Sequence, residues 1–170
     1  MSAGPGARAD EALEALYRDH AEPLLNYLYR LLGSRSEAEE ALQDTFVKAH
    51  GALGRLPADA NHRPWLYRIA TNTATDRLRR RRLIRWLPFL ETDRADSALD
   101  RPEAVALERT DVARALRRLS PHDRQALWLY CVAGYDTAEI ANILGISRAA
   151  AKKRVARARE RFGRVYQGEE

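Results

Sequence analysis

The stretch TAEIANILGIS, residues 137–147, outlines two helical segments on either side of a tight turn. Small Ala141 lets the two helices approach closely, and Gly145 stands where the turn needs a left-handed residue. Glycine adopts that backbone conformation without a side-chain clash. Ser147 is suited to cap the second helix, which continues from Arg148 to about Tyr166. This layout predicts a helix-turn-helix, a motif whose second helix can enter the major groove of DNA with its N-terminal residues.

The second helix of this motif is strongly basic. Between Arg148 and Arg164 it carries eight basic residues and one acidic residue, Glu160. The apolar seam that would hold the two helices together consists of Ile140, Leu144, Ile146, Ala151 and Val155. A plain pair of helices with a solvated basic face is the alternative interpretation. We favour DNA binding because the glycine turn, the small residue four positions before it and the one-sided charge occur together.

Apolar residues with the helical period recur along the rest of the 170 residues, and no stretch alternates convincingly as a strand would. One apolar face runs from Leu13 to Leu31, with Gly33 as its stop. Ser36 followed by Glu39 has the spacing of a capping box and predicts the start of a second helix. The apolar stripe of that helix is Ala38, Leu42, Phe46, Ala49 and Leu53. The pattern predicts an all-α protein.

A third helix is expected to start near Pro64, after a loop that extends through about His62. Its inward residues would be Leu66, Ile69, Ala70, Thr73 and Ala74. Its opposite face would present Arg68, Asn72, Thr75 and Arg79. Later helices are expected around Val105 to Leu119 and after Ser120, whose hydroxyl would cap a helix filled by Ala126, Leu127, Leu129, Tyr130 and Val132. Cys131 is expected to fill core space at the end of that helix, with redox sensing as the alternative.

Charge divides the chain into three parts. Residues 1–85 carry a net +3, residues 86–111 a net −4 and residues 112–170 a net +6, which gives the whole chain a formal +5. Six arginines lie within the nine positions from Arg77 to Arg85. We therefore expect two small basic helical domains, residues 11–85 and 112–166, joined by an acidic linker over residues 86–111. The apolar tract at residues 83–90 would either pack on the first domain, which we favour, or engage a partner.

Several classes of protein are disfavoured by composition. One cysteine and four scattered histidines predict neither a disulfide framework nor a metal site. No Gly-rich phosphate loop, nucleophile elbow or converging pair of carboxylates is found, so we expect no cofactor and no enzymatic activity. No apolar run approaches the roughly 20 residues that span a bilayer, and the first ten residues do not have the pattern of a signal peptide. We expect a cytoplasmic protein with no membrane insertion.

Two further blocks identify a family. SEAEEALQDTFVKA at residues 36–49 and PWLYRIATNTATDR at residues 64–77 resemble regions 2.2 to 2.4 of the bacterial sigma-70 family, in its extracytoplasmic-function (ECF) type. Residues 115–162 resemble region 4 of the same family. The resemblance covers about residues 11–82 and 112–165, in the family's order. It implies a region 2-like bundle of three or four helices and a region 4-like helix-turn-helix domain.

The resemblance also implies a function, that of a promoter-specificity subunit. Such a protein binds the RNA polymerase core through the clamp helices of the largest subunit and the flap. It recognises the −10 and −35 promoter elements and assists promoter opening. A cognate anti-sigma factor is implied as a further partner, and the protein would be associated with the nucleoid when bound to polymerase.

Site residues follow by position within the matching motifs. For the −10 element, together with the loop at residues 56–63, they are Arg63, Arg68, Asn72, Asp76, Arg79 and Arg80. For the −35 element they are Arg148, Lys152, Lys153 and Arg157, and for the polymerase core they are Glu39, Gln43, Asp44 and Thr45. The alternative for this last set is a solvated acidic face. Trp65 and Tyr67 would either offer stacking surfaces to unpaired bases or pack in the core, and we favour core packing for Trp65.

One alternative function comes from a different class. A stand-alone helix-turn-helix repressor or activator would use its N-terminal domain for dimerisation, bind closed duplex by itself and recognise a palindromic operator. A purely structural adaptor is disfavoured by the basic helix.

Overall fold

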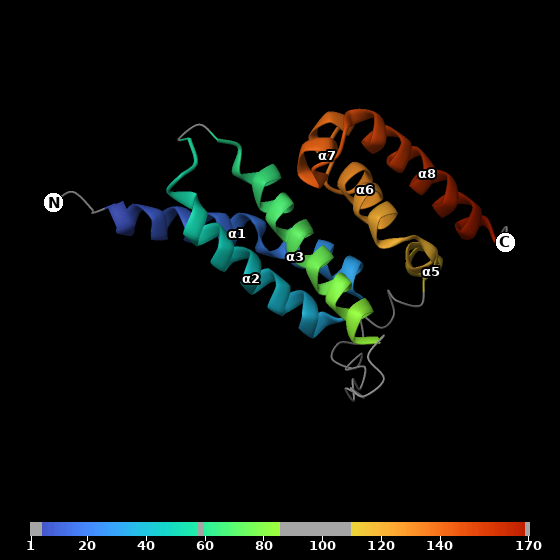
Figure 1. Ribbon diagram of the computed structural model, residues 1–170, viewed down its shortest axis with the longest axis horizontal. Coiled ribbons are helices and arrows are strands. Elements are labelled where there is room, and N and C mark those ends of the chain that lie inside the picture. The colour runs from blue at the N-terminus through green and yellow to red at the C-terminus, as the bar shows by residue number, and fades with distance from the viewer. Residues whose placement is uncertain (1–4, 58–59, 86–109, 169–170) are drawn as a thin grey trace. The chain divides into compact units, whose positions relative to one another are not determined.

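The computed structural model describes residues 5–57, 60–85 and 110–168, which form helices and no strand (Figure 1). The chain divides into two compact units, Met1–Asp93 and Arg94–Glu170. The prediction of an all-α protein is therefore confirmed for the described residues. The acidic segment at residues 86–109, the expected helix residue Val105 and most of the apolar tract lie outside them. Of that tract, Leu83 is described and is 62% exposed.

The first unit is a bundle of α1 (Pro5–Leu32), α2 (Arg35–Leu53) and α3 (His62–Arg85), each of which packs against the other two. Its core contains Leu24 and Leu28 of α1, Phe46 of α2, and Leu66 and Ala70 of α3. The predicted stripe of α2 is buried along its whole length, from Ala38 to Leu53. Of the inward residues predicted for α3, only Ile69 is half-buried rather than buried.

The start of α2 differs from the prediction. Gly33 ends α1 with a φ of 74°, and the N-cap of α2 is Ser34 rather than Ser36. Ser34 has extended backbone, and its hydroxyl accepts a hydrogen bond from the Glu37 backbone N at 3.4 Å. Ser34 and Glu37 have the same spacing as Ser36 and Glu39, so the local pattern fits both positions. Because Gly33 has already ended the preceding helix, the first of the two serines takes the capping position.

Two aromatic residues of α3 lie at different depths. Tyr67 is 3% exposed, and one turn later the hydroxyl of Thr71 shares a 2.8 Å hydrogen bond with the hydroxyl of Tyr27 of α1. Trp65 is half-buried and contacts His62 edge-on, with 6.3 Å between ring centroids. Core packing therefore accounts for Tyr67 fully and for Trp65 only in part.

The second unit contains α5 (Asp111–Arg118), α6 (Pro121–Cys131), α7 (Thr137–Leu144) and α8 (Arg148–Gln167). Helix α8 packs against the other three. One hydrophobic cluster joins Leu116, Leu119, Leu127 and Ala158, with Phe162 packed against it. Thr110 and Ser120 cap α5 and α6 with their hydroxyls, and Pro121 occupies the first turn of α6, as predicted for Ser120 and Pro121.

The turn between α7 and α8 has the predicted geometry. Gly145 has a φ of 65°, and the Ser147 hydroxyl accepts a hydrogen bond from the Ala150 backbone N at 3.2 Å. Asp136 and Glu139 form a capping box at the start of α7. In the apolar seam, Ile143 is 2% exposed although it was not among the predicted residues. Leu144 and Ile146 are half-buried, and Ile140, Ala151 and Val155 are buried.

The predicted core at the end of α6 is partly wrong. Cys131 is exposed, Val132 is 61% exposed and Tyr130 is 38% exposed. Ala126, Leu127 and Leu129 are buried as predicted, and Ala133, four residues after Leu129, is buried in place of Val132. Cys131 and Val132 therefore point away from the core.

Candidate DNA-binding and partner-binding surfaces

The outer face of α3 carries the residues predicted to face DNA. Arg68, Asn72 and Arg79 are exposed and recur at helical spacing on one face. Thr75 of the same face is half-buried, and its hydroxyl donates to the Thr71 backbone O at 2.8 Å. The exposed positions combine two guanidinium groups, which can bind phosphates, with one amide, which can form paired hydrogen bonds with a base edge.

The remaining residues predicted for this surface are Arg63 in the first turn of α3 and Asp76 and Arg80 in its second half. The guanidinium of Arg63 lies 5.7 Å from the centroid of the Tyr67 ring. Arg80 is exposed, and Asp76 accepts a 3.0 Å hydrogen bond from Arg79 Nη2. Of the loop at residues 56–63, residues 58 and 59 lie outside the described part of the chain. The structure thus places all six residues on α3, with Asp76 bound to one of the cations.

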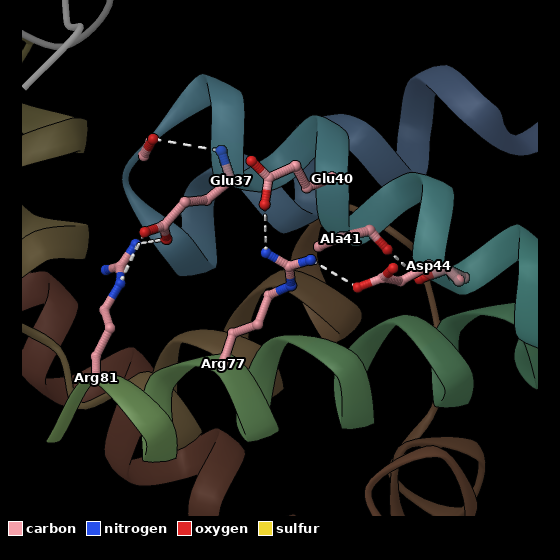
Figure 2. A network of polar contacts seen from close by, with 8 residues as sticks. Glu37, Glu40, Ala41, Asp44, Arg77 and Arg81 are labelled. Atoms are coloured by element: carbon pink, nitrogen blue, oxygen red, sulfur yellow. Dashed lines mark hydrogen bonds and ion pairs between the residues drawn. The ribbon is translucent and has the colours of Figure 1, made fainter. Parts of the chain in front are cut away.

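A network of ion pairs joins α3 to α2 (Figure 2). Arg77 donates from Nη1 to Glu40 Oε2 at 2.9 Å and from Nη2 to Asp44 Oδ2 at 2.6 Å. One turn later, Arg81 donates to Glu37 Oε1 at 3.1 Å and to the Leu32 backbone O at 3.0 Å. Arg77 and Arg81 of the arginine run therefore bind other helices of their own domain, which sequence reasoning missed.

This network has an electrostatic consequence for Arg77. Burial acts to lower the pKa of its guanidinium, but the hydrogen bonds and charges of Asp44 and Glu40 together outweigh burial and raise that pKa. The sequence shows only that each helix carries like charges at helical spacing, and it does not show that the two charged faces meet. Acids recur at 37, 40 and 44 on α2, and arginines recur at 77 and 81 on α3.

The exposed side of α2 differs from the predicted partner-binding set at one position. Glu39 is paired with Arg35 at 2.6 Å and stays 52% exposed, and Gln43 is exposed. The structure places Thr45 inside the bundle instead. Its side chain is 0% exposed and its hydroxyl donates to the Ala41 backbone O at 2.7 Å, so it offers no surface to a partner.

Val47 adds an apolar residue to this side of α2. It is 72% exposed. Val47 follows Glu39 and Gln43 at intervals of four residues, which places the three on one helical face. Sequence reasoning missed Val47. Val47 is an apolar residue that does not follow the spacing of the buried residues Leu42, Phe46 and Ala49, and this mismatch was the available signal.

The basic residues at the start of α8 are accessible. Arg148, Lys152 and Lys153 are exposed, and Ala151 and Val155 bury the opposite face against the rest of the unit. Arg159, further along, lies with its guanidinium 5.7 Å from the centroid of the Tyr130 ring. The cations at this end of α8 are therefore accessible to a phosphate backbone.

Arg157, the fourth residue predicted for this surface, is bound within the unit. Its Nη2 and Nε donate to Asp123 Oδ1 at 2.6 Å and 3.2 Å. Burial acts to raise the pKa of Asp123. Hydrogen bonds from Arg157 and Ser120, with the charges of Arg157 and Arg161, outweigh burial and hold that pKa below its ordinary value.

Two classes of site find no support in the described residues. No group of three or more histidine, cysteine, aspartate or glutamate residues there could hold a metal ion. Within the same ranges, no helix is both long and apolar enough to cross a membrane.

Comparison with known families matches both units. The model of Sigma-70 region 2 matches residues 16–84, and that of Sigma-70 region 4 matches residues 109–162. The chain is 36% identical over 156 residues to the ECF RNA polymerase sigma factor SigM of Mycobacterium tuberculosis, covering 91% of this chain and 76% of that protein. It is 31% identical to the RNA polymerase sigma factor CarQ of Myxococcus xanthus, covering 91% of this chain and 88% of CarQ.

Two solved structures share the fold. The sigma factor RpoE of Bartonella quintana, in complex with the anti-sigma factor NepR, matches with a TM-score of 0.76 at 23% identity, over 94% of this chain and 99% of that one. CnrH, in complex with the cytosolic domain of CnrY, matches with a TM-score of 0.70 at 25% identity, over 98% of this chain and 97% of that one.

Proposed function

Since the chain belongs to the sigma-70 family, as a member of its ECF type, we propose how its surfaces perform the work of a promoter-specificity subunit of RNA polymerase. The observation that carries the proposal is the pairing of two matched units that each expose a basic helix, α3 in one and α8 in the other. A stand-alone regulator would need only the second of these.

The first unit would bind the −10 element through α3. Asn72 would contact a base edge of the non-template strand, and Arg68 and Arg79 would neutralise phosphates on either side of it. Arg63, Arg80 and Asp76 would border the same surface. Because unpaired bases must be held apart from their partners during opening, cations and an amide on a rigid helix suit this task.

The second unit would bind the −35 element through α8. Arg148, Lys152 and Lys153 would contact the DNA from the first two turns of the helix, where recognition helices enter the major groove. Lysine is a flexible point charge, so Lys152 and Lys153 are better suited to phosphates than to paired base contacts. Arg157 would extend this surface by one turn.

Helix α2 would bind the clamp helices of the largest polymerase subunit. Glu39 and Gln43 present polar groups on its exposed face, and Val47 adds an apolar contact one turn later. Asp44, although paired with Arg77, keeps 52% of its side chain exposed and would lie at the edge of this surface. The second unit would contact the polymerase flap.

The protein would act without chemistry of its own, because sigma factors are regulatory subunits. Because promoter DNA and polymerase are its proposed partners, the protein would be cytoplasmic, and it would be associated with the nucleoid while bound to polymerase. A cognate anti-sigma factor would be a further partner. Support for this comes from the solved structures of RpoE with the anti-sigma factor NepR and of CnrH with a domain of CnrY.

Run-off transcription tests the proposal. Core polymerase, alone and with the purified chain, would be incubated with a library of genomic fragments and nucleotides. We expect discrete transcripts that need the chain, and promoters with two elements separated by a spacer. Absence of any transcript, with tight binding of the chain alone to a palindromic site, would support the stand-alone regulator instead.

A further inference from the structure

Asp123 of α6 is a buried carboxylate beneath the basic face of α8. Its side chain is 2% exposed, whereas that of its partner Arg157 is 56% exposed. Both hydrogen bonds from Arg157 end on Oδ1 of Asp123. Arg161, one turn later on α8, lies with Nη1 at 3.7 Å from Oδ2. The backbone N of Asp123 is bound to the Ser120 hydroxyl at 3.1 Å. The carboxylate is therefore a fixed point against which Arg157 is held.

The way in which Arg157 is held leaves one edge of its guanidinium exposed. A guanidinium is a planar fork with five N–H donors. Asp123 occupies the edge formed by Nε and Nη2, and Nη1 has no partner among residues 5–57, 60–85 and 110–168. The outer edge, formed by Nη1 and the second N–H of Nη2, faces away from Asp123. Two parallel donors of this kind match the O6 and N7 acceptors of guanine in the major groove.

We propose that Asp123 is a positioning residue for base recognition, which fixes the outer edge of the Arg157 guanidinium for a guanine of the −35 element. The inference rests on the proposed function, since it assigns a specificity determinant to the surface that would meet that element. Asp123 itself would not touch DNA. Its contribution would be to hold a long, flexible side chain in one orientation before binding, which lowers the conformational entropy lost on forming the contact.

In this arrangement the lysines of α8 would bind phosphates, and Arg157 would recognise a base. Lys152 and Lys153 are exposed and would attract phosphates of any sequence. Arg157 is planar and anchored, which favours one base over another. Removing Lys152 should therefore weaken binding to every sequence, whereas disturbing the anchored pair should weaken discrimination between sequences.

The experiment measures discrimination by the holoenzyme. Core polymerase with the full chain would be titrated against the strongest promoter fragment recovered by run-off transcription. The same titration would use derivatives in which each G·C pair of the −35 element is replaced by A·T. The variants are Asp123→Asn, Arg157→Lys and Lys152→Ala. Asp111→Asn is the matched control, because Asp111 is also paired with an arginine of the second unit, Arg114 at 2.9 Å, but is 61% exposed.

We expect Asp123→Asn and Arg157→Lys each to lower the preference for one particular guanine by about 5- to 150-fold, the range for losing a paired base contact. The double variant Asp123→Asn/Arg157→Lys should lose no more preference than Arg157→Lys alone, because Asp123→Asn removes the negative charge that holds Arg157 and Arg157→Lys removes the paired donors themselves. Lys152→Ala should lower affinity for all fragments alike. Asp111→Asn should keep the wild-type preference.

Retention of the wild-type preference by Asp123→Asn or by Arg157→Lys would overturn the proposal. So would an equal loss of affinity for all fragments by Asp123→Asn accompanied by loss of helicity, since that result indicates a purely structural pair. Arg157→Lys keeps a cation beside Asp123, so it tests base recognition even if Asp123→Asn folds poorly. Failure of the proposed function would appear earlier, as the absence of any run-off transcript with the wild-type chain.

Discussion

Arg77 on α3 and Asp44 on α2 are joined by an ion pair, with 2.6 Å between Nη2 and Oδ2. The two residues belong to helices with different proposed partners, promoter DNA for α3 and polymerase for α2. Arg77 also binds Glu40, so one guanidinium ties two acids of α2 to the basic run of α3 (Figure 2). Part of the charge in that run therefore stabilises the bundle and is directed away from the outer face of α3.

Replacement of Arg77 tests this role. Arg77→Met keeps the aliphatic stem but removes both ion pairs. Glu40 and Asp44 are 60% and 52% exposed, so solvent screens the two pairs, and we expect their loss to lower the free energy of unfolding by about 0.5–1 kcal/mol. Urea denaturation followed by circular dichroism measures it. Arg82→Met, at an exposed position of the same helix, should change that free energy by less than about 0.5 kcal/mol. Equal effects of the two variants would contradict the assignment.

Asn72 should determine base preference at the −10 element. Asn72→Ala is expected to reduce the preference for the native −10 sequence by about 1–3 kcal/mol, because one paired base contact is lost. Asn72 is exposed, so folding and polymerase affinity should stay unchanged. Transcription from promoters with altered −10 bases measures the preference. Asn142→Ala, at an exposed position of α7, is the matched control. A parallel loss of polymerase binding by Asn72→Ala would show that the residue is structural.

Glu39 should contribute to polymerase binding. Glu39→Ala is expected to weaken the affinity of the full chain for core polymerase several-fold, about 1 kcal/mol, as for a contact residue within an interface. Fluorescence anisotropy of the labelled chain titrated with core polymerase measures this affinity. Glu14→Ala is a close control, because Glu14 and Glu39 are both exposed and both paired with an arginine four residues away. If both variants bind polymerase equally well, the α2 surface is misassigned.

Local signals in the sequence predicted much of this fold. Gly145 and Ser147 act through their own backbone and the next turn, so their roles follow from type and spacing alone. Burial was harder to predict, because it depends on which face a neighbouring helix covers. Thr45 is buried and Cys131 is exposed, both against expectation, although each lies on a correctly predicted helix.

The ion pairs that join different helices within each unit could not be predicted from the local sequence pattern. Arg77 and Asp44 are 33 residues apart, and Arg157 and Asp123 are 34 apart. No period within one helix relates such positions, and only the packing of α3 on α2 and of α8 on α6 brings them together. The family resemblance supplied the candidate roles of the surface residues. Of these residues, the structure shows that Asp44 and Arg157 each form an ion pair with another helix of their own unit.

The backbone at Gly145 gives a prediction with an internal comparison. Gly145→Ala should destabilise the second unit by about 1–2 kcal/mol, because a side chain at a φ of 65° is strained even though no atom lies within 4 Å of an added Cβ. Gly51→Ala adds the same methyl group inside α2, also with nothing within 4 Å, and should stabilise the first unit by about 0.5–1 kcal/mol. Thermal unfolding of both variants measures the two signs. A stabilising effect at Gly145 would contradict the left-handed turn.

The pair between Asp123 and Arg157 should make the stability of the second unit depend on pH. Because the pKa of Asp123 is lower in the folded protein than its ordinary value, its contribution to stability is fully present above that ordinary value. The contribution is lost as the pH falls through the lower, folded-state pKa. Asp123→Asn cannot titrate, so the stability difference between wild type and this variant should be constant from pH 7 to about 5 and shrink below about pH 4.

Urea unfolding of the full chain, followed by hydrogen exchange of the α6 and α8 amides, measures this difference for the second unit. Asp111→Asn, at an exposed pair, should show a small difference from wild type throughout that range. A difference for Asp123→Asn that persists unchanged to pH 3 would mean that the negative charge of Asp123 does not stabilise the fold. In that case packing of the Asp123 side chain, rather than its ion pair with Arg157, would hold α8 against α6.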